Sequence, residues 1–97
     1  MATKRLGDDE VRARLGEIPG WDLASGKLHR ELRFPSFVEA FGFMTRLALV
    51  AERSDHHPEW FNVYDRVVID LQTHDAGGIS ERDFALATAV NHLLDEG

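Results

Sequence analysis

The chain has 97 residues, no cysteine and a formal net charge of −6. This length fits one domain, residues 1–97, with a modest core, and the absence of thiols excludes disulfides and thiolate metal sites while favouring stabilisation by oligomerisation. The acidic balance argues against a nucleic-acid surface, and no signal peptide or membrane-length apolar run is visible, so we expect a cytoplasmic protein that binds neither nucleic acid nor membrane.

The N-terminal third predicts an arm, a short helix and a β-hairpin. Residues 1–6 predict a loose arm. Acidic residues at positions 8–10 suit a helix N-terminus, and Pro19-Gly20 ends this helix. Apolar residues recur in between at helical spacing, at Val11, Leu15 and Ile18. Apolar and polar residues then alternate over 21–34 around a turn at Ser25-Gly26, which predicts a hairpin with one wetter face.

A long central helix is predicted from Phe37 to about Asp55. Ser36 followed three residues later by Glu39 is a capping box, and Pro58 forces the chain out of the helix. One broad apolar face carries Phe37, Ala40, Phe41, Met44, Leu47, Ala48 and Ala51. The nearly opposite face carries Val38, Gly42 and Leu49. Two apolar faces predict that one packs on the sheet and the other on a partner subunit; the alternative is scattered exposed apolar residues on a monomer.

The C-terminal half predicts a second hairpin and a last helix. Phe61–Tyr64 and Val67–His74 alternate as strands, with the turn at Asp65-Arg66. Ser80 with Asp83 repeats the capping-box pattern. The helix that follows ends at Gly97. Its core-facing residues are Phe84, Ala87, Val90, Leu93 and Leu94. The order α-β-β-α-β-β-α predicts an α+β two-layer domain, in which a four-stranded antiparallel sheet carries three helices on one face.

Three of the five histidines lie on two loops that could converge. His56 and His57 occupy a helix-to-strand corner before Pro58, and His74 ends a strand beside the loop at 75–78. Since the unperturbed imidazole titrates near neutral pH, these side chains can give and take protons there. Two alternatives remain open. The histidines could be solvated loop residues, or they could form a zinc site, although adjacent histidines chelate poorly because their side chains point to opposite faces.

Carboxylates and aromatic side chains flank these histidines. Glu52 or Asp55 could orient an imidazole, and Asp83 either caps its helix or lines the same cleft. Trp60 and Phe61 either form an aromatic wall for a flat heterocycle or pack in the core. No nucleophilic serine motif, phosphate loop or dinucleotide fingerprint is present, so the sequence favours proton-transfer chemistry such as the elimination of water.

The residues around the histidines resemble the signature of the pterin-4a-carbinolamine dehydratases. The resemblance rests on Glu52, Asp55–Tyr64, Thr73–Asp75 and Gly78–Asp83, with support from Ala40–Arg46. It spans roughly residue 21 to the C-terminus, so nothing is carried onto the first twenty residues. The order of this central block is unusual, which makes the resemblance specific.

The resemblance implies an enzyme, a 4a-hydroxytetrahydrobiopterin dehydratase. Such a hydro-lyase converts 4a-hydroxytetrahydropterin to quinonoid dihydropterin and water, without metal or cofactor, and so recycles the pterin of aromatic amino-acid hydroxylases. His56 and His74 would act as acid and base, and His57 would bind the pterin. The predicted catalytic set is His56, His57, His74 and Asp83. The predicted substrate-binding set is Glu52, His56, His57, Pro58, Trp60, Thr73, His74, Asp75 and Ala76.

The same resemblance implies assembly. Members of the family form homodimers by sheet extension, and some pair further through the central helix into homotetramers. Some animal members also bind a homeodomain transcription factor. The alternative function is therefore a non-enzymatic dimerisation or coactivator-type module on the same scaffold. The intact histidine triad favours the enzyme, since a pure binding module does not need it.

Overall fold

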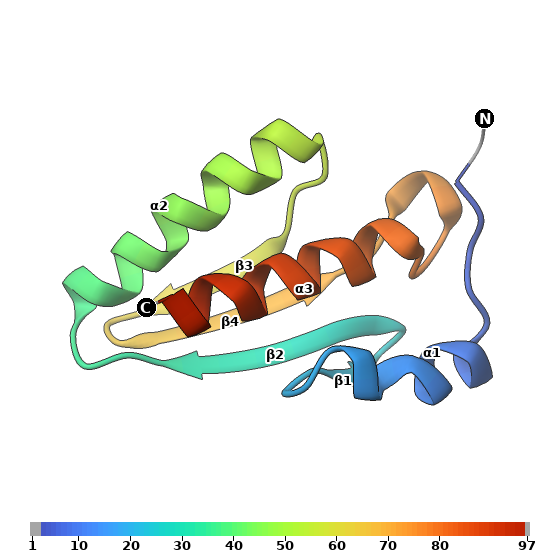
Figure 1. The fold of residues 1–97 in the computed structure, drawn as a ribbon, viewed down its shortest axis with the longest axis horizontal. Coiled ribbons are helices and arrows are strands. Elements are labelled where there is room, and N and C mark those ends of the chain that lie inside the picture. Colours follow the sequence, from blue (N-terminus) through green and yellow to red (C-terminus); the bar gives the residue numbers. More distant parts are fainter. Residues whose placement is uncertain (1–2, 97) are drawn as a thin grey trace.

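The structure, a computed structural model, describes residues 3–96, so the predicted helix end at Gly97 lies outside the described residues. Figure 1 traces the chain. The elements in order are α1 (Asp8–Arg14), the 3-10 turn η1 (Leu15–Glu17), β1 (Asp22–Ala24), β2 (Lys27–Arg33), α2 (Phe37–Ser54), β3 (Glu59–Val63), β4 (Arg66–Leu71), the 3-10 turn η2 (His74–Ala76) and α3 (Glu81–Glu96).

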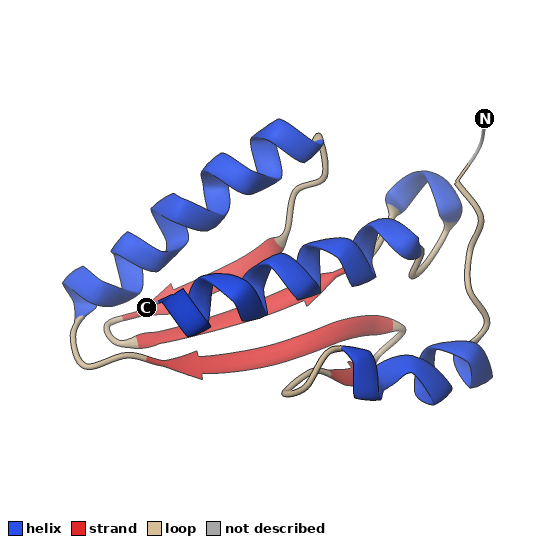
Figure 2. Ribbon diagram, viewed as in Figure 1, coloured by secondary structure: helices blue, strands red, loops and turns tan. Residues whose placement is uncertain are grey.

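The strands form one antiparallel sheet in the order β1-β2-β4-β3. Helices α2 and α3 lie over the same face of this sheet (Figure 2). The predicted α+β fold is therefore confirmed, together with its element order. None of the helices within residues 3–96 is long and apolar enough to cross a membrane.

Alternation along the strands decides which sheet face is covered. On β4, Val67, Ile69 and Leu71 are buried, while the residues between them are partly exposed. The register of β2 places Leu28 opposite Leu71 and Leu32 opposite Val67, so apolar side chains from both strands meet on one face. The core lies between this face and the helices, and burial of its apolar area is the main stabilising contribution.

The other sheet face is open and carries polar contacts between side chains of different strands. They are His29–Asp70 at 2.7 Å, Lys27–Glu59 at 2.6 Å and Arg66–Glu31 at 3.4 Å. Water screens pairs of this kind, so each adds little to stability. We therefore attribute the stability of the fold mainly to the apolar side chains on the covered face of the sheet.

Helix α2 begins at the predicted cap, but it is rotated relative to the predicted apolar face. The Ser36 hydroxyl accepts the Glu39 N–H at 3.2 Å. The fully buried residues are Ala40, Phe43, Leu47 and Ala51. The prediction that Phe37, Phe41 and Ala48 face the core is wrong, since all three are exposed. We attribute this rotation to Phe43. The centroid of its ring lies 5.2 Å from that of the Phe34 ring, so this side of the helix faces the end of β2.

The β3–β4 turn lies one residue earlier than predicted. The strand β3 starts at Glu59, and the two-residue turn is Tyr64-Asp65 instead of Asp65-Arg66. Tyr64 has φ 51°, the left-handed conformation that two-residue hairpin turns prefer because it matches the strand twist. The sequence carries no Asn-Gly or Asp-Gly pair that would have announced this turn.

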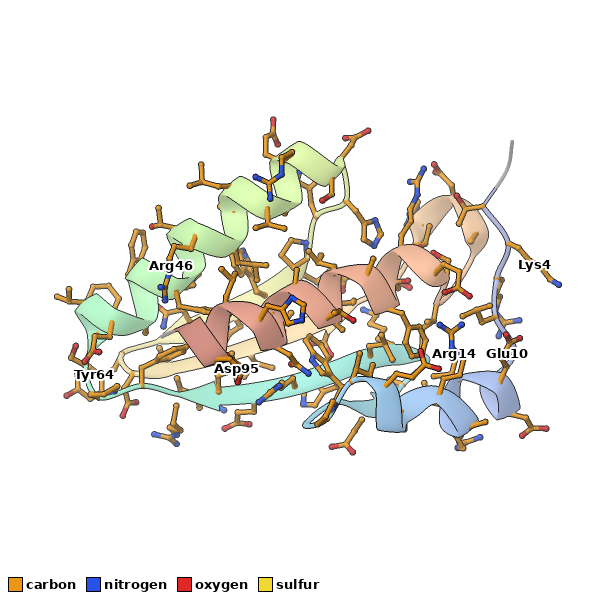
Figure 3. The ribbon with its side chains drawn as sticks, viewed as in Figure 1. Lys4, Glu10, Arg14, Arg46, Tyr64 and Asp95 are labelled. Atoms are coloured by element: carbon orange, nitrogen blue, oxygen red, sulfur yellow. The ribbon has the colours of Figure 1, made fainter. Side chains whose placement is uncertain are left out.

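The N-terminal arm is docked, which contradicts the predicted loose arm for the residues that the structure describes. Leu6 is buried, and its N–H donates to the Ile79 carbonyl at 2.8 Å. Figure 1 shows this segment beside the loop that precedes α3. Further along, Arg14 lies between α1 and the start of α3 (Figure 3), with its guanidinium 2.9 Å from Glu81 and 4.4 Å from the centre of the Phe84 ring. Positions 1 and 2 of the predicted arm lie outside the described residues.

Candidate active site

His56 lies where the chain leaves α2 and turns towards β3. Asp55 ends the helix in the left-handed conformation, with φ 52°. A short polar side chain tolerates this conformation better than most residues. The turn places the His56 N–H 3.1 Å from the Ala51 carbonyl and buries the imidazole, which is 10% exposed.

The buried partner of this imidazole is Asp83, from the first turn of α3. His56 Nε2 lies 2.6 Å from Asp83 Oδ1. The second oxygen, Oδ2, accepts the Thr73 hydroxyl at 2.8 Å and the Ser80 N–H at 2.9 Å. Asp83 is fully buried, so these three donors replace its hydration. Because a carboxylate only accepts, the geometry places a proton on His56 Nε2 and leaves Nδ1 as the other ring nitrogen for chemistry.

The contact between Ser80 and Asp83 answers the question that the sequence left open. The carboxylate accepts the N–H of Ser80, the residue before α3, as the capping-box pattern predicts, and it also contacts the imidazole of His56. The Ser80 hydroxyl bonds the Thr73 hydroxyl and accepts the Arg82 N–H at 3.2 Å. A single helix start therefore ties together the two loops that carry His56 and Thr73.

His57 has a different environment from its neighbour. Its Nε2 lies 2.9 Å from Glu52 Oε1, on the last turn of α2. The two side chains are 57% and 82% exposed, so the contact is solvated and adjustable. One of the two adjacent histidines is thus locked inside the fold, and the other is free to contact a ligand.

His74 stands at the start of η2, in a loop whose two ends are clamped together. The Thr73 N–H donates to the Gly78 carbonyl at 2.7 Å, and the Gly78 N–H returns to Thr73 at 3.3 Å. Gly77 closes the loop in the left-handed conformation, with φ 75°, where glycine carries no Cβ penalty. The His74 side chain is exposed at the tip of this loop.

The two loops line an open cavity of about 210 Å³. It is lined by Asp55, His56, His57, Gln72, Thr73, His74, Asp75 and Arg82. All three predicted catalytic histidines are therefore brought together with Thr73 and Asp75, and Asp83 lies directly behind His56. Four predicted substrate-binding residues do not line this cavity: Glu52, Pro58, Trp60 and Ala76. Trp60 packs against the core instead.

Two lining residues and one supporting residue were missed at the sequence level. Gln72 and Arg82 line the cavity, and Ser80 joins the hydrogen bonds around Asp83. Gln72 and Arg82 directly precede Thr73 and Asp83, which were predicted, so adjacency along the chain was the available signal. Their side-chain types alone point to no chemistry, which is why the sequence did not single them out.

A larger hollow of about 570 Å³ lies elsewhere, between the first half of α2 and the last turns of α3. Its lining includes Phe34, Val38, Gly42 and Leu93, and it holds no histidine. Chemistry therefore points to the smaller cavity. Within residues 3–96, no group of three or more His, Cys, Asp or Glu side chains is arranged to hold a metal ion.

The fold and the cavity together define a small α+β protein with a histidine-lined site suited to acid–base chemistry. Residues 4–93 match the model of a protein family described as pterin 4 alpha carbinolamine dehydratase. The chain belongs to this family, which confirms the resemblance seen in the sequence.

Individual relatives agree with this result. One from Solibacter usitatus, provisionally named a pterin-4-alpha-carbinolamine dehydratase, is 54% identical over 91 residues, which is 94% of this chain and 96% of the relative. Another of the same provisional name, from Prochlorococcus marinus strain MIT 9303, is 52% identical over the full length of both chains. A crystal structure of a transcriptional coactivator/pterin dehydratase from Brucella melitensis superposes with a TM-score of 0.88 at 41% identity, covering 93% of this chain and 98% of that one.

Proposed function

We propose that this protein dehydrates 4a-hydroxytetrahydropterin to quinonoid dihydropterin and water, with its histidines as general acid and base. The observation that carries the proposal is the convergence of His56, His57 and His74 on one cavity, with the buried Asp83 behind His56. Membership of the dehydratase family supports the same reaction. The site would serve a pterin cofactor cycle, and the cytoplasm is the location that we propose for it.

The reaction needs two proton transfers at neighbouring positions of the pterin ring. The hydroxyl on C4a leaves as water after it gains a proton, and the ring nitrogen N5 loses its proton as the C4a–N5 double bond forms. We assign these transfers to His56 and His74, which belong to different loops and can therefore act on two different atoms. Groups in such roles contribute ~100- to 10,000-fold.

Each histidine would depend on its surroundings in its own way. Asp83 would hold the His56 ring and stabilise its protonated form, because both of its oxygens are already engaged within the fold. His57, exposed and paired with Glu52, would mainly bind and orient the ring. Asp75 and Thr73 would complete the wall on the side of His74.

The direct test measures the breakdown of 4a-hydroxytetrahydropterin with and without the purified protein. We expect the protein to accelerate the loss of the 4a-hydroxyl compound above its spontaneous rate. A rate equal to the spontaneous one would refute the proposal. The same assay after dialysis against a strong chelator addresses zinc: we expect unchanged turnover, and activity that returns only with zinc would favour a metal mechanism.

A second candidate is a binding module of the coactivator type. The Brucella melitensis neighbour is named both a transcriptional coactivator and a pterin dehydratase. On this chain, α2 exposes apolar residues, with Val38 78% and Leu49 67% exposed. Such residues in a row suit contact with another chain. A protein that assembles normally but never accelerates dehydration would favour this candidate over the enzyme.

We also propose that the chain forms a homodimer or homotetramer. The strand β3 is a sheet edge, and its exposed residues Phe61 and Val63 are 54% and 53% exposed. An unpaired edge of this kind can pair with a second copy. Pairing through the exposed apolar residues of α2, Val38 and Leu49, would add a second contact.

A further inference from the structure

Gln72 is a lining residue whose orientation is fixed by its neighbour. Its amide nitrogen Nε2 donates to Glu59 Oε2 at 2.7 Å. A carboxylate accepts hydrogen bonds and cannot donate one, so the NH₂ end of the amide must face Glu59. The carbonyl oxygen Oε1 is then held at the opposite end of the planar amide, as an acceptor.

Glu59 is itself held in place from the other side. Lys27 Nζ lies 2.6 Å from Glu59 Oε1, across the open sheet face. The hydrogen bond from Lys27 lowers the pKa of Glu59, and the hydrogen bond from Gln72 and the charge of His74 lower it further. Glu59 therefore stays an acceptor at neutral pH, and a flip of the Gln72 amide would set its oxygen against a carboxylate.

The acceptor end of Gln72 is available to a ligand. Gln72 lines the cavity together with His57 and His74, and within residues 3–96 its Oε1 has no hydrogen-bond partner. A ligand group that meets this oxygen must be an N–H or O–H donor. A pterin offers such a donor in its 2-amino group, whereas the 2,4-dioxo pteridine lumazine presents an oxygen at that position.

We propose that Gln72 Oε1 accepts a hydrogen bond from the 2-amino group of the pterin and makes the site selective for 2-amino-4-oxo over 2,4-dioxo pteridines. This inference rests on the proposed function, because it takes the cavity to be the pterin site. Gln72 is then a specificity residue that contacts the ring away from the reacting C4a atom. In the lumazine complex, two acceptor oxygens would face each other and leave a polar group unpaired. A site that accepts a hydrogen bond from its ligand strongly rejects an analogue that lacks the donor.

The test is a binding cycle that does not require turnover. Pterin and lumazine are titrated into the wild type and into Gln72→Met, which keeps the side-chain length and removes the acceptor, and Kd is read from the ligand fluorescence. We expect the wild type to prefer pterin by at least about 10-fold. In Gln72→Met we expect pterin binding to weaken by roughly 3- to 10-fold, while lumazine binding stays the same or tightens.

A matched control is Glu31→Gln, which changes a polar side chain on the same open face but outside the cavity lining, and should alter neither Kd. If Gln72→Met does not fold, Gln72→Asn replaces it, since the shorter amide cannot reach both Glu59 and the ligand and should lose the same preference. Wild-type binding of pterin with no change of selectivity in the variants overturns this inference and leaves the proposed function standing. A wild type that binds neither ligand overturns both.

Discussion

Replacing Asp83 by Asn tests the buried carboxylate in the most informative way. The substitution keeps the shape of the side chain but exchanges one acceptor oxygen for an NH₂ donor. Two donors, the Thr73 hydroxyl and the Ser80 N–H, converge on Oδ2, and one, His56 Nε2, meets Oδ1. The remaining carbonyl should therefore stay with Thr73 and Ser80, and the new NH₂ group should face His56.

That arrangement reverses the His56 tautomer. Nε2 must then accept the hydrogen bond, so the proton of the neutral ring moves to Nδ1, the nitrogen left for the substrate. We expect Asp83→Asn to lower kcat by ~100- to 10,000-fold, which is the contribution of a general acid–base group that is lost when the imidazole holds the wrong tautomer. The lost charge-assisted hydrogen bond should also lower the free energy of unfolding by about 1.5–3 kcal/mol.

Three measurements separate these effects. Stopped-flow dehydration gives kcat, urea unfolding gives the free energy, and ¹⁵N NMR of the His56 ring reports the tautomer directly. Asp70→Asn is the matched control, since it alters an imidazole–carboxylate contact of 2.7 Å with His29 on the open sheet face, outside the cavity lining. A folded Asp83→Asn protein with unchanged kcat and an unchanged His56 tautomer would refute the reasoning.

Further predictions concern the core, the assembly and the acid limb of stability. Phe43→Ala should lower the free energy of unfolding by about 3–5 kcal/mol in urea, because the ring is fully buried, whereas Phe41→Ala should change it by less than about 1 kcal/mol; equal effects would contradict the assigned helix face. Leu49→Glu should reduce the assembly state in sedimentation equilibrium while the monomer stays folded, and a monomeric wild type at micromolar concentration would contradict the proposed oligomer. The hydrogen bond from Arg14 lowers the pKa of Glu81, so this pair stabilises the fold above the unfolded-state pKa of about 4.3 and loses its effect as the pH falls through the lower folded-state value. Because Glu81 is 65% exposed, Glu81→Gln should cost less than about 1 kcal/mol at pH 7 and nothing at pH 2, and a cost that is the same at both pH values would contradict the ion-pair account.

The sequence predicted the fold class and element order because each boundary carried a local chemical signal. Ser36 with Glu39 marked the start of α2, and Ser80 with Asp83 marked the start of α3. The exact apolar face of α2 was not predictable in the same way. Its rotation depends on the contact between Phe34 and Phe43, which joins two elements and has no signature in the helix alone.

The candidate site, too, was predictable only where a local signal was present. Residue type and motif order were enough to select His56 and His74, but not to rank their burial. His56 is buried against Asp83, which lies 27 residues further along the chain. The orientation of Gln72 likewise depends on Lys27, which reaches Glu59 across the sheet. Such couplings follow from strand order and register, which a periodic pattern does not specify.

The most direct test of the central claim is the dehydration rate of His74→Ala beside that of the wild type. His74 is exposed on a loop clamped by backbone hydrogen bonds, so its removal should leave the fold intact. We expect kcat of His74→Ala to fall by ~100-fold or more while its unfolding midpoint is unchanged. His56→Ala should lower kcat by a comparable factor. Wild-type dehydration rates in both variants would contradict the assignment of this cavity as the proton-transfer site.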